Sequence, residues 1–379
     1  MGHGGIPMSR PAVARIDFAA LRDNLRTIRQ RVSGARLWAV IKANGYGHGL
    51  IPVAHALREA DGLAVSCLEE ALLLREAGIR QPILLLEGLF GPDEIQAAWE
   101  AGLELVVHAE AALTVLEATP RRWPRLWIKI DTGMHRLGFS LHEFPDIHGR
   151  VARLSATDPG LMTHLASADE PGHPGVEAQL AAFWRVTQGR PGPRSLANSA
   201  AILQYPQCHA DWVRPGLLLF GVSPVPGRLV EAMGLKPVMT FATEIMAIKR
   251  VHQGDRVGYG GVFQAEADGW IGIAAAGYGD GYPYHAPSGT PVTVAGRIVP
   301  LAGRVSMDMI AVDLGSHPVA IGSPVTLWGR DLPVETVARH AGTIPYELLC
   351  GVAQRVRHER VDVPEEQTDH VQTVDRVSL

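Results

Sequence analysis

A lysine that follows an apolar run is the first candidate for chemistry in this sequence. Residues 37–41 are apolar and typical of a buried strand, and Lys42 comes next, at the start of a glycine-rich turn over residues 43–49. Lysine is rarely buried unless it is paired or used chemically, and desolvation favours the neutral, nucleophilic amine that Schiff-base chemistry needs. A lysine whose amine simply reaches water from the end of a strand is the alternative, and this segment alone does not decide between them.

Polar side chains also follow several other apolar runs. They are Tyr46 in the same turn, the segment 131–136, His164, Asn198 with Ser199, and Arg214. Alone, His164 could be a satisfied core histidine and Arg136 a surface ion pair. A lysine, a tyrosine, a histidine and two arginines at the ends of strands are harder to explain in that way. The backbone N–H groups after Arg214, and Ser199 at the start of a helix-like segment, are suited to binding a phosphate.

The elements that would position these groups alternate along the first part of the chain. Apolar strand-like runs cover residues 37–41, 63–67, 83–86, 105–107, 126–130, 161–164, 195–197 and 212–220. Segments with helical periodicity cover residues 17–32, 50–60, 68–77, 92–101, 109–118 and 176–188. Eight strands that alternate with helices predict an α/β fold, a (β/α)8 TIM-like barrel. An open, doubly wound sheet is the alternative, because counting strands does not show closure.

The pattern changes after about residue 239. Short β-rich runs cover residues 244–251, 270–274, 291–294, 309–312 and 324–328, and one helical stretch lies near residues 334–341. Glycines separate these runs, as in a mainly β domain. We therefore predict a barrel over residues 11–238, a β domain over residues 239–363 and a disordered tail over residues 364–379.

Composition limits the class of protein. The 379 residues are 46% hydrophobic and 20% charged, with a net charge of −4, which argues against a nucleic-acid partner or a polybasic membrane surface. Cys67, Cys208 and Cys350 are far apart and give no zinc or disulfide signature, and no H-E-x-x-H pair occurs, so we expect no metal. Residues 1–9 lack an apolar signal core, and no run is long enough to span a membrane. These features predict a cytoplasmic protein with no membrane partner.

Seven motifs, in order along the chain, resemble those of the alanine racemases, pyridoxal-phosphate enzymes with a barrel and a β domain. They are AVIKANGYGHG at 39–49, KIDTGMHRLGF at 129–139, NSAA at 198–201, VRPG at 213–216, RVGYGG at 256–261, GYGDG at 277–281 and GRVSMD at 303–308. The resemblance spans residues 16–361. It implies interconversion of L- and D-alanine through an external aldimine of pyridoxal 5'-phosphate, supply of D-alanine for peptidoglycan, and a homodimer with active sites shared between subunits.

The resemblance also implies roles for individual residues. Lys42 would hold the cofactor and act as one base, and Tyr259 of the partner subunit would be the opposing base. Arg214 would face the pyridine nitrogen. Apart from the resemblance, a phenol that acts as a base needs nearby positive charge or hydrogen-bond donors, and we expect His164 and Arg214, linked to each other toward the cofactor, to supply them to Tyr259. The phosphate-binding positions match Tyr46, Ser199, Gly216, Leu217 and Tyr346.

Further matches concern the substrate. Arg136 and the backbone N–H of Met307 correspond to groups near the substrate carboxylate and the cofactor phenolate, and Tyr278 corresponds to a residue at the substrate entrance. Lys129 falls on a lysine that is often carbamylated in the family, where it orients Arg136; an unmodified strand lysine is the alternative. His135 stands where the family commonly has glycine, and Ser306 stands where some members have cysteine, so substrate breadth stays open.

The implied roles agree with the chemistry of inversion at a carbon atom. A proton must leave one face of Cα and another must arrive at the opposite face, which needs two acid–base groups: Lys42 for D-alanine and Tyr259 for L-alanine. Amines and phenols are protonated in neutral water, so the site must favour their deprotonated forms. A guanidinium keeps its proton, so Arg214 would leave the ring nitrogen unprotonated and make the cofactor a weaker electron sink.

Three alternatives remain at this point. The first is a racemase of the same family with broader specificity, for serine or other small amino acids. The second is a related decarboxylase of basic amino acids, which would need a cysteine near the substrate and a glycine-rich phosphate loop. The third is a non-catalytic cofactor-binding protein, which would resemble the barrel alone. The motif around Tyr259 and the β domain argue against the second and third.

Overall fold

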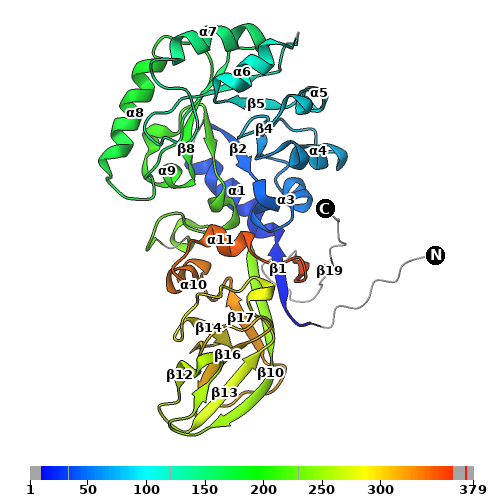
Figure 1. The fold of residues 1–379 in the computed structure, drawn as a ribbon, viewed down its shortest axis with the longest axis vertical. Helices are drawn as coiled ribbons and strands as arrows, with labels where there is room; N and C mark the ends of the chain where they lie inside the picture. The colour runs from blue at the N-terminus through cyan, green and yellow to red at the C-terminus, as the bar shows by residue number, and fades with distance from the viewer. Residues whose placement is uncertain (1–9, 33, 120, 229, 362–371, 374–379) are drawn as a thin grey trace, which may run out of the picture. The chain divides into compact units, whose positions relative to one another are not determined.

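The structure is a computed structural model that describes residues 10–32, 34–119, 121–228, 230–361 and 372–373, in two compact units (Figure 1). The first, which we call the barrel unit, is Leu21–Leu235. The second, which we call the β unit, combines the described residues before Leu21 with those from Lys236 onward.

Eight parallel strands close into a barrel in the barrel unit. They are β2 (Arg36–Val40), β3 (Gly62–Val65), β4 (Ile83–Leu85), β5 (Glu104–Val107), β6 (Leu126–Lys129), β7 (Gly160–Met162), β8 (Arg194–Asn198) and β9 (Trp212–Arg214). The last strand returns to the first, with Val213 opposite Leu37. The predicted barrel is therefore confirmed, and the open sheet is excluded.

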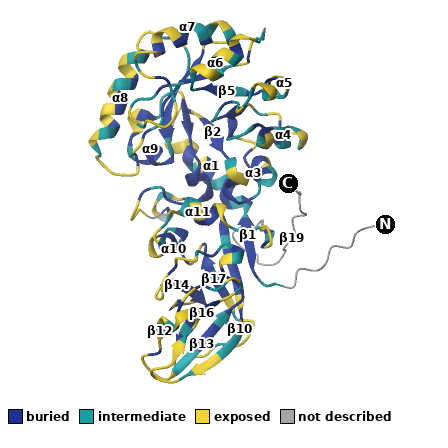
Figure 2. Ribbon diagram, viewed as in Figure 1, coloured by how far each residue is buried: buried dark blue, intermediate teal, exposed yellow. Residues whose placement is uncertain are grey.

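Helices alternate with these strands, and most of them bury one face and expose the other (Figure 2). They are α1 (Phe18–Arg31), α2 (Lys42–Tyr46), α3 (Leu50–Ala56), α4 (Leu68–Glu76), α5 (Ile95–Glu100), α6 (Glu110–Glu117), α7 (Phe144–Leu154), α8 (Pro174–Thr187) and α9 (Ser199–Gln204). The sequence did not predict α7. The predicted strand 212–220 is wrong beyond Arg214: Pro215 has no N–H for a sheet, and Leu217–Phe220 form a 3-10 helix.

Tryptophans fill the barrel interior near the amino ends of its strands. Trp38 stacks on Trp212 with 4.4 Å between ring centroids and meets Trp127 edge-on at 6.1 Å. Glycines on neighbouring strands make room for these rings, since a Cβ atom at Gly62 would lie 2.1 Å from Trp38 and one at Gly160 would lie 2.2 Å from Trp127. The amino end is thus packed with apolar rings, and polar side chains gather at the carboxyl end.

The β unit contains a nine-stranded sheet and a small hairpin. The sheet comprises β1 (Val13–Asp17), β10 (Met239–Val251), β13 (Gly269–Ala274), β14 (Pro291–Val294), β15 (Arg297–Pro300), β16 (Ile310–Gly315), β17 (Pro324–Trp328), β18 (Arg357–Val361) and β19 (Gln372–Thr373). The hairpin is β11 (Arg256–Val257) with β12 (Phe263–Gln264), and two helices, α10 (Val334–His340) and α11 (Pro345–Cys350), complete the unit.

Strand β1 corrects the expected start of the barrel domain. It pairs antiparallel with β10 and parallel with β18, so these residues belong to the β unit although the predicted barrel domain began at residue 11. The apolar pattern of β1 is too short to show which unit it joins. Of the predicted tail over residues 364–379, only Gln372 and Thr373 lie within the described residues, and they pair with β18.

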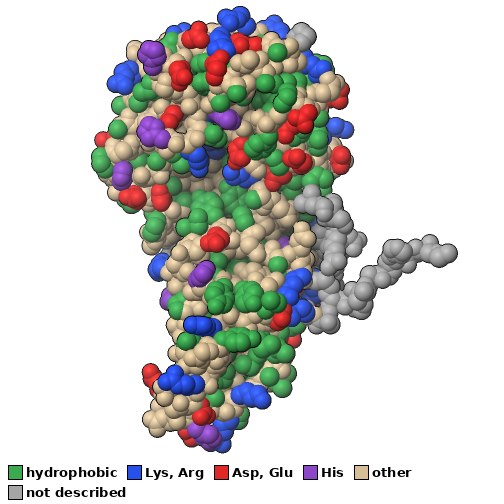
Figure 3. All heavy atoms as spheres, viewed as in Figure 1, with side chains coloured by type: hydrophobic (Ala, Val, Ile, Leu, Met, Phe, Trp, Pro, Cys, Tyr) green, Lys and Arg blue, Asp and Glu red, His purple; other side chains and the backbone are tan. Residues whose placement is uncertain are grey.

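Charge is dispersed over the molecule. Acidic and basic side chains are interspersed on the face shown in Figure 3, in keeping with the small net charge of −4. Among the described helices, none has the length and apolar character that crossing a membrane requires.

Candidate active site

The turn after β2 has an unusual backbone. Ala43, Asn44, Gly45 and Tyr46 all have positive φ angles, between 52° and 62°, although three of them are not glycine. Such a conformation costs energy and persists only where surrounding contacts hold it. Here the Asn44 side chain accepts a hydrogen bond from the backbone N–H of Leu50 at 2.8 Å. The turn places the Lys42 side chain at the carboxyl end of the barrel and buries the Tyr46 ring.

The amine of Lys42 has an acidic neighbour that the sequence analysis did not single out. Its Nζ lies 3.3 Å from Oε1 of Glu87, and both side chains are more than a third exposed. Glu87 comes two residues after β4, so it follows a strand of the same barrel, as the predicted site residues do. That position was the signal available in the sequence.

The other basic groups of this rim repel one another. Burial, with the charges of Arg214, Arg136 and Lys42, lowers the pKa of Lys129 well below its usual range. Burial and neighbouring cations, Lys129 first among them, also lower the pKa of His164 well below its usual range, so that imidazole is neutral at pH 7. An anionic ligand would relieve this repulsion.

Arg214 is buried and aimed by its neighbours. Its Nη1 donates to Oγ of Ser195 at 2.6 Å, and its Nη2 donates to the carbonyl oxygens of Thr163 at 2.7 Å and Leu196 at 3.1 Å. Among the described residues, none accepts a hydrogen bond from Nε. Burial lowers the pKa of Arg214 to about 10, so the guanidinium is charged at neutral pH. The expected link between His164 and Arg214 is not a direct hydrogen bond here, since His164 Nε2 pairs with Asn198 Nδ2 at 3.3 Å.

A second turn, after β9, brings backbone close to the ring of Tyr46. Ser199 Oγ accepts hydrogen bonds from the backbone N–H groups of Gly216 at 2.9 Å and Leu218 at 3.5 Å. A Cβ atom at Gly216 would lie 2.4 Å from Oη of Tyr46, so only glycine fits there. The N–H of Leu217 has no acceptor among the described residues. Hydroxyl groups and free N–H groups in one small cradle are typical of a phosphate site.

The corner that carries Arg136 is organised by an acid. Oδ1 of Asp131 accepts from the N–H groups of Gly133 at 2.9 Å and His135 at 3.1 Å. His135 has a φ angle of 54°, which explains why a glycine is common at this position in the family. Its ring is 83% exposed and lies 3.0 Å from Oδ2 of Asp131, so His135 alters the surroundings of Asp131 rather than those of Arg136.

Tyr259 of the β unit contrasts with these groups. Its side chain is 70% exposed, and it stands in a loop whose glycines, Gly258, Gly260 and Gly261, all have positive φ angles. The Arg256 guanidinium donates to the carbonyl oxygen of Gly261 at 2.8 Å and braces the loop. The loop thus holds a phenol away from its own unit.

Two other predicted residues of the β unit are also exposed to solvent. Tyr278 is 41% exposed and Met307 is 53% exposed, and the N–H of Met307 has no acceptor among the residues that the structure describes. Tyr278 meets the ring of Tyr284 edge-on at 5.7 Å. Tyr346 lies in α11 and is partly buried.

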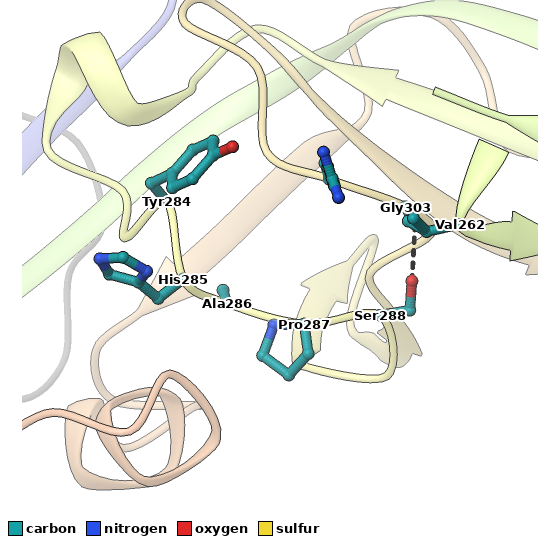
Figure 4. A pocket seen from close by; sticks show the side chains of 8 residues that line it. Val262, Tyr284, His285, Ala286, Pro287, Ser288 and Gly303 are labelled. Carbon is teal, nitrogen blue, oxygen red and sulfur yellow. Dashed lines mark hydrogen bonds between the residues drawn. The ribbon is translucent and has the colours of Figure 1, made fainter. Parts of the chain in front are cut away.

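A cleft of about 470 Å³ lies beside the Tyr259 loop within the β unit (Figure 4). Its lining residues are Val262, Tyr284, His285, Ala286, Pro287, Ser288, Gly303 and Arg304. One wall is fixed by a hydrogen bond from the N–H of Gly303 to Oγ of Ser288 at 2.9 Å, drawn as a dashed line.

Pyridoxal phosphate fits the groups of the barrel rim. An amine suits its aldehyde, the cradle around Ser199 and Gly216 suits its phosphate, and the free Nε of Arg214 suits a ring nitrogen that accepts a hydrogen bond. A closed barrel with such a rim, joined to a β unit that presents a tyrosine, defines a class of pyridoxal-phosphate enzymes.

Comparisons with known proteins identify the family within this class. Residues 16–224 match the model of the alanine racemase N-terminal domain, and residues 238–360 match that of the C-terminal domain. An alanine racemase of Nitrosomonas europaea is 51% identical over 361 residues, 92% of this chain and 98% of its own. One of Shewanella loihica is 48% identical over 347 residues, 90% of this chain and 97% of its own.

Solved structures agree with the sequence comparisons. The biosynthetic alanine racemase of Pseudomonas aeruginosa gives a TM-score of 0.89 at 42% identity, covering 93% of this chain and 99% of that one. The alanine racemase of Acinetobacter baumannii gives 0.88 at 37% identity, covering 93% and 100%. The chain belongs to the alanine racemase family. It is a pyridoxal-phosphate-dependent isomerase that racemises alanine, and the predicted family, fold, reaction and cofactor are confirmed.

Proposed function

We propose that Lys42 and Tyr259 are the two acid–base groups of the reaction, and that they come from different subunits of a homodimer. The observation that carries this proposal is the contrast in their surroundings: Lys42 lies at a rim of coupled basic groups, whereas Tyr259 is 70% exposed on a braced loop. A catalytic phenol needs a site that excludes water, and the barrel rim of a second copy would supply one.

Each acid–base group acts at one face of the substrate carbon. Nζ of Lys42 takes the Cα proton from D-alanine or delivers one to form it, and Oη of Tyr259 does the same for L-alanine. One proton leaves and one returns to the opposite face, so each turnover inverts the configuration and the two groups exchange protonation states. Bound pyridoxal phosphate supplies the electron sink that makes this proton acidic enough to remove.

The remaining residues bind and orient. Arg136 and the N–H of Met307 hold the substrate carboxylate, and Tyr278 stands at the substrate entrance. Nε of Arg214 would donate to the ring nitrogen of the cofactor, and His164, which is neutral, lies near the basic groups of the rim. Tyr46, Ser199, Gly216, Leu217 and Tyr346 would hold the phosphate of the cofactor.

Lys129 is proposed to carry a carbamate. A neutral amine can add CO2 with loss of a proton, and the lowered pKa of Lys129 makes the neutral form available. The product carries a negative charge, which would offset the repulsion among Arg136, Arg214 and Lys42 and would orient Arg136.

We further propose that the enzyme works in the cytoplasm and supplies D-alanine for peptidoglycan. The Pseudomonas aeruginosa neighbour is described as the biosynthetic enzyme, which supports a biosynthetic role for this chain.

Hybrid dimers test the shared site. K42A and Y259F would each be inactive alone, but a dimer of one chain of each has one intact site, with Lys42 from the Y259F chain and Tyr259 from the K42A chain. Mixing them under conditions that exchange subunits should restore about one quarter of the wild-type activity, since about half of the dimers are hybrid and each has one working site. A mixture that stays inactive although hybrid dimers are present would overturn the shared site.

A further inference from the structure

Asp280 is a fully buried acid that none of the roles above uses. Its side chain is 1% exposed, and a charge can be buried so deeply only when it is paired. Two arginines flank it: Nη2 of Arg10 lies 2.7 Å from Oδ2, and Nε of Arg355 lies 2.8 Å from Oδ1. Both arginines are themselves more than a third exposed, so the carboxylate is the fixed point of the cluster.

The same arginines also hold the segment that contains Met307. Nη2 of Arg355 donates to Oδ1 of Asp308 at 2.8 Å and to the carbonyl oxygen of Met307 at 3.3 Å. Nη2 of Arg10 donates to the carbonyl oxygen of Asp308 at 3.2 Å. One carboxylate therefore fixes the segment 306–308 through two guanidinium groups.

Asp280 also fixes the turn that carries Tyr278. Its Oδ2 accepts a hydrogen bond from the N–H of Gly277 at 3.0 Å. The turn is joined to the segment 306–308 by the N–H of Tyr278, which donates to Ser306 at 3.0 Å, and by the N–H of Gly279, which donates to Met307 at 2.8 Å.

The two segments pack so closely that two positions of the turn have no room for a side chain. A Cβ atom at Gly277 would lie 2.1 Å from the carbonyl oxygen of Ser306, and one at Gly279 would lie 2.6 Å from Nη2 of Arg355. The carbonyl oxygen of Met307 is used twice in these contacts, while its N–H has no acceptor within the described ranges. The cluster thus fixes the Met307 peptide and leaves its donor available.

We infer that Asp280 and Arg355 are positioning residues for substrate: together with Arg10 they set the place of the Met307 N–H, which receives the substrate carboxylate, and of the Tyr278 ring. This inference rests on the proposed function, because it takes the role of Met307 from there. In this inference Asp280 positions substrate-binding groups, a role that goes beyond stabilising the fold.

The β unit offers a matched control for this inference. Glu359 on β18 is also a buried carboxylate, 5% exposed, between two arginines: Arg15 at 3.4 Å and Arg357 at 2.5 Å. Its described contacts include neither Tyr278 nor Met307. Losing either charge should lower stability, but only the loss at Asp280 should change how substrate binds.

The experiment compares D280N with E359Q in the holoenzyme. Propionate serves as a probe of carboxylate binding, and its Kd is read from the cofactor absorbance alongside KM and kcat for L-alanine. We expect D280N to raise both the Kd of propionate and KM by about 10-fold, because a displaced Met307 N–H would bind the carboxylate less well. We expect E359Q to leave both values within about twofold of the wild type. D308N, at a 43%-exposed partner of the same arginines, should raise both by about threefold.

The outcomes separate the inference from the proposed function. If D280N lowers Tm as E359Q does but leaves the Kd of propionate and KM unchanged, Asp280 is only structural and the inference fails. If D280N does not fold, D308N decides, and unchanged values in D308N overturn the inference. Racemisation by Y259F at the wild-type rate would instead overturn the proposed function, whatever D280N shows.

Discussion

The barrel rim and the Tyr259 loop differ in how they surround their functional groups. The rim brings Lys42, Arg136 and Arg214 close enough to Lys129 that their positive charges, with burial, lower the pKa of Lys129, and it buries Arg214. The Tyr259 loop contains three glycines with positive φ angles and exposes the phenol of Tyr259 to solvent. The comparison shows that the barrel unit concentrates positive charge, which suits an anionic cofactor and substrate. The β unit instead exposes hydrogen-bond donors, namely the phenol of Tyr259 and the N–H of Met307.

Hydrogen bonding repeats this division. In the rim, Arg214 uses both terminal nitrogens on its own barrel and keeps only Nε unpaired among the described residues. In the β unit, the carbonyl oxygen of Met307 accepts two hydrogen bonds, and its N–H has no acceptor among the described residues. Each unit therefore fixes a group firmly from behind while leaving one donor for a ligand, which is how a site is organised before its ligand binds.

The largest effect is expected from K42A. Loss of the amine should remove both the covalent anchor of the cofactor and one base, and lower racemisation by about 1,000-fold or more. The measurement is turnover of L-alanine, together with peptide mapping after borohydride reduction of the wild-type holoenzyme. The reduced cofactor stays attached to the lysine that bound it and so labels that residue. This label should be found on Lys42; the other lysines of the chain are Lys129, Lys236 and Lys249. K249A, at an exposed strand position, is the control and should keep full activity; a label on another lysine would refute the assignment.

A smaller effect is expected from G216A. The added Cβ atom would meet Oη of Tyr46 at 2.4 Å, and that ring is buried against Phe220 with 5.0 Å between centroids, so the phosphate cradle must distort. Overpacking of this kind should weaken cofactor binding by about 10-fold. The measurement is the Kd of pyridoxal phosphate for protein stripped of cofactor. G149A, on α7 with no atom near the added Cβ, should leave the Kd unchanged; equal effects of the two variants would show that the cradle is elsewhere.

The smallest effect is expected at Lys129. If it carries a carbamate, 13C-bicarbonate should add one carbonyl resonance to the NMR spectrum of the wild type and none to that of K129A. Loss of the contact that orients Arg136 should lower kcat/KM by about threefold to tenfold, mainly through KM. A spectrum without the added resonance at neutral pH would mean that Lys129 is unmodified.

The fold could be predicted where pattern and length agree. The barrel strands carry continuous apolar runs because both faces are buried, and all eight were found from them. The strands β1, β11, β12, β15, β18 and β19 and the helices α7 and α11 were missed. Strand β1 pairs with strands more than 200 residues away, at β10 and β18, and no local signal reports such pairing.

The site was predictable only in part. Lys42, His164, Arg214 and Tyr259 stand out because reactive residues follow strands or sit in glycine-rich motifs. Glu87 also follows a strand and Asp280 also sits in a glycine-rich motif, but neither position shows which groups the carboxylate contacts. Their importance comes from contacts with Lys42 and with two distant arginines, which only the folded chain creates.

The most direct measurement is hydrogen exchange at Cα of each enantiomer in deuterated water by Y259F. The account assigns D-alanine to Lys42 and L-alanine to Tyr259. Y259F should therefore exchange the α-hydrogen of D-alanine without forming L-alanine, and should leave that of L-alanine in place. Exchange from L-alanine at the wild-type rate would contradict the account, because a group other than Tyr259 would then serve that face.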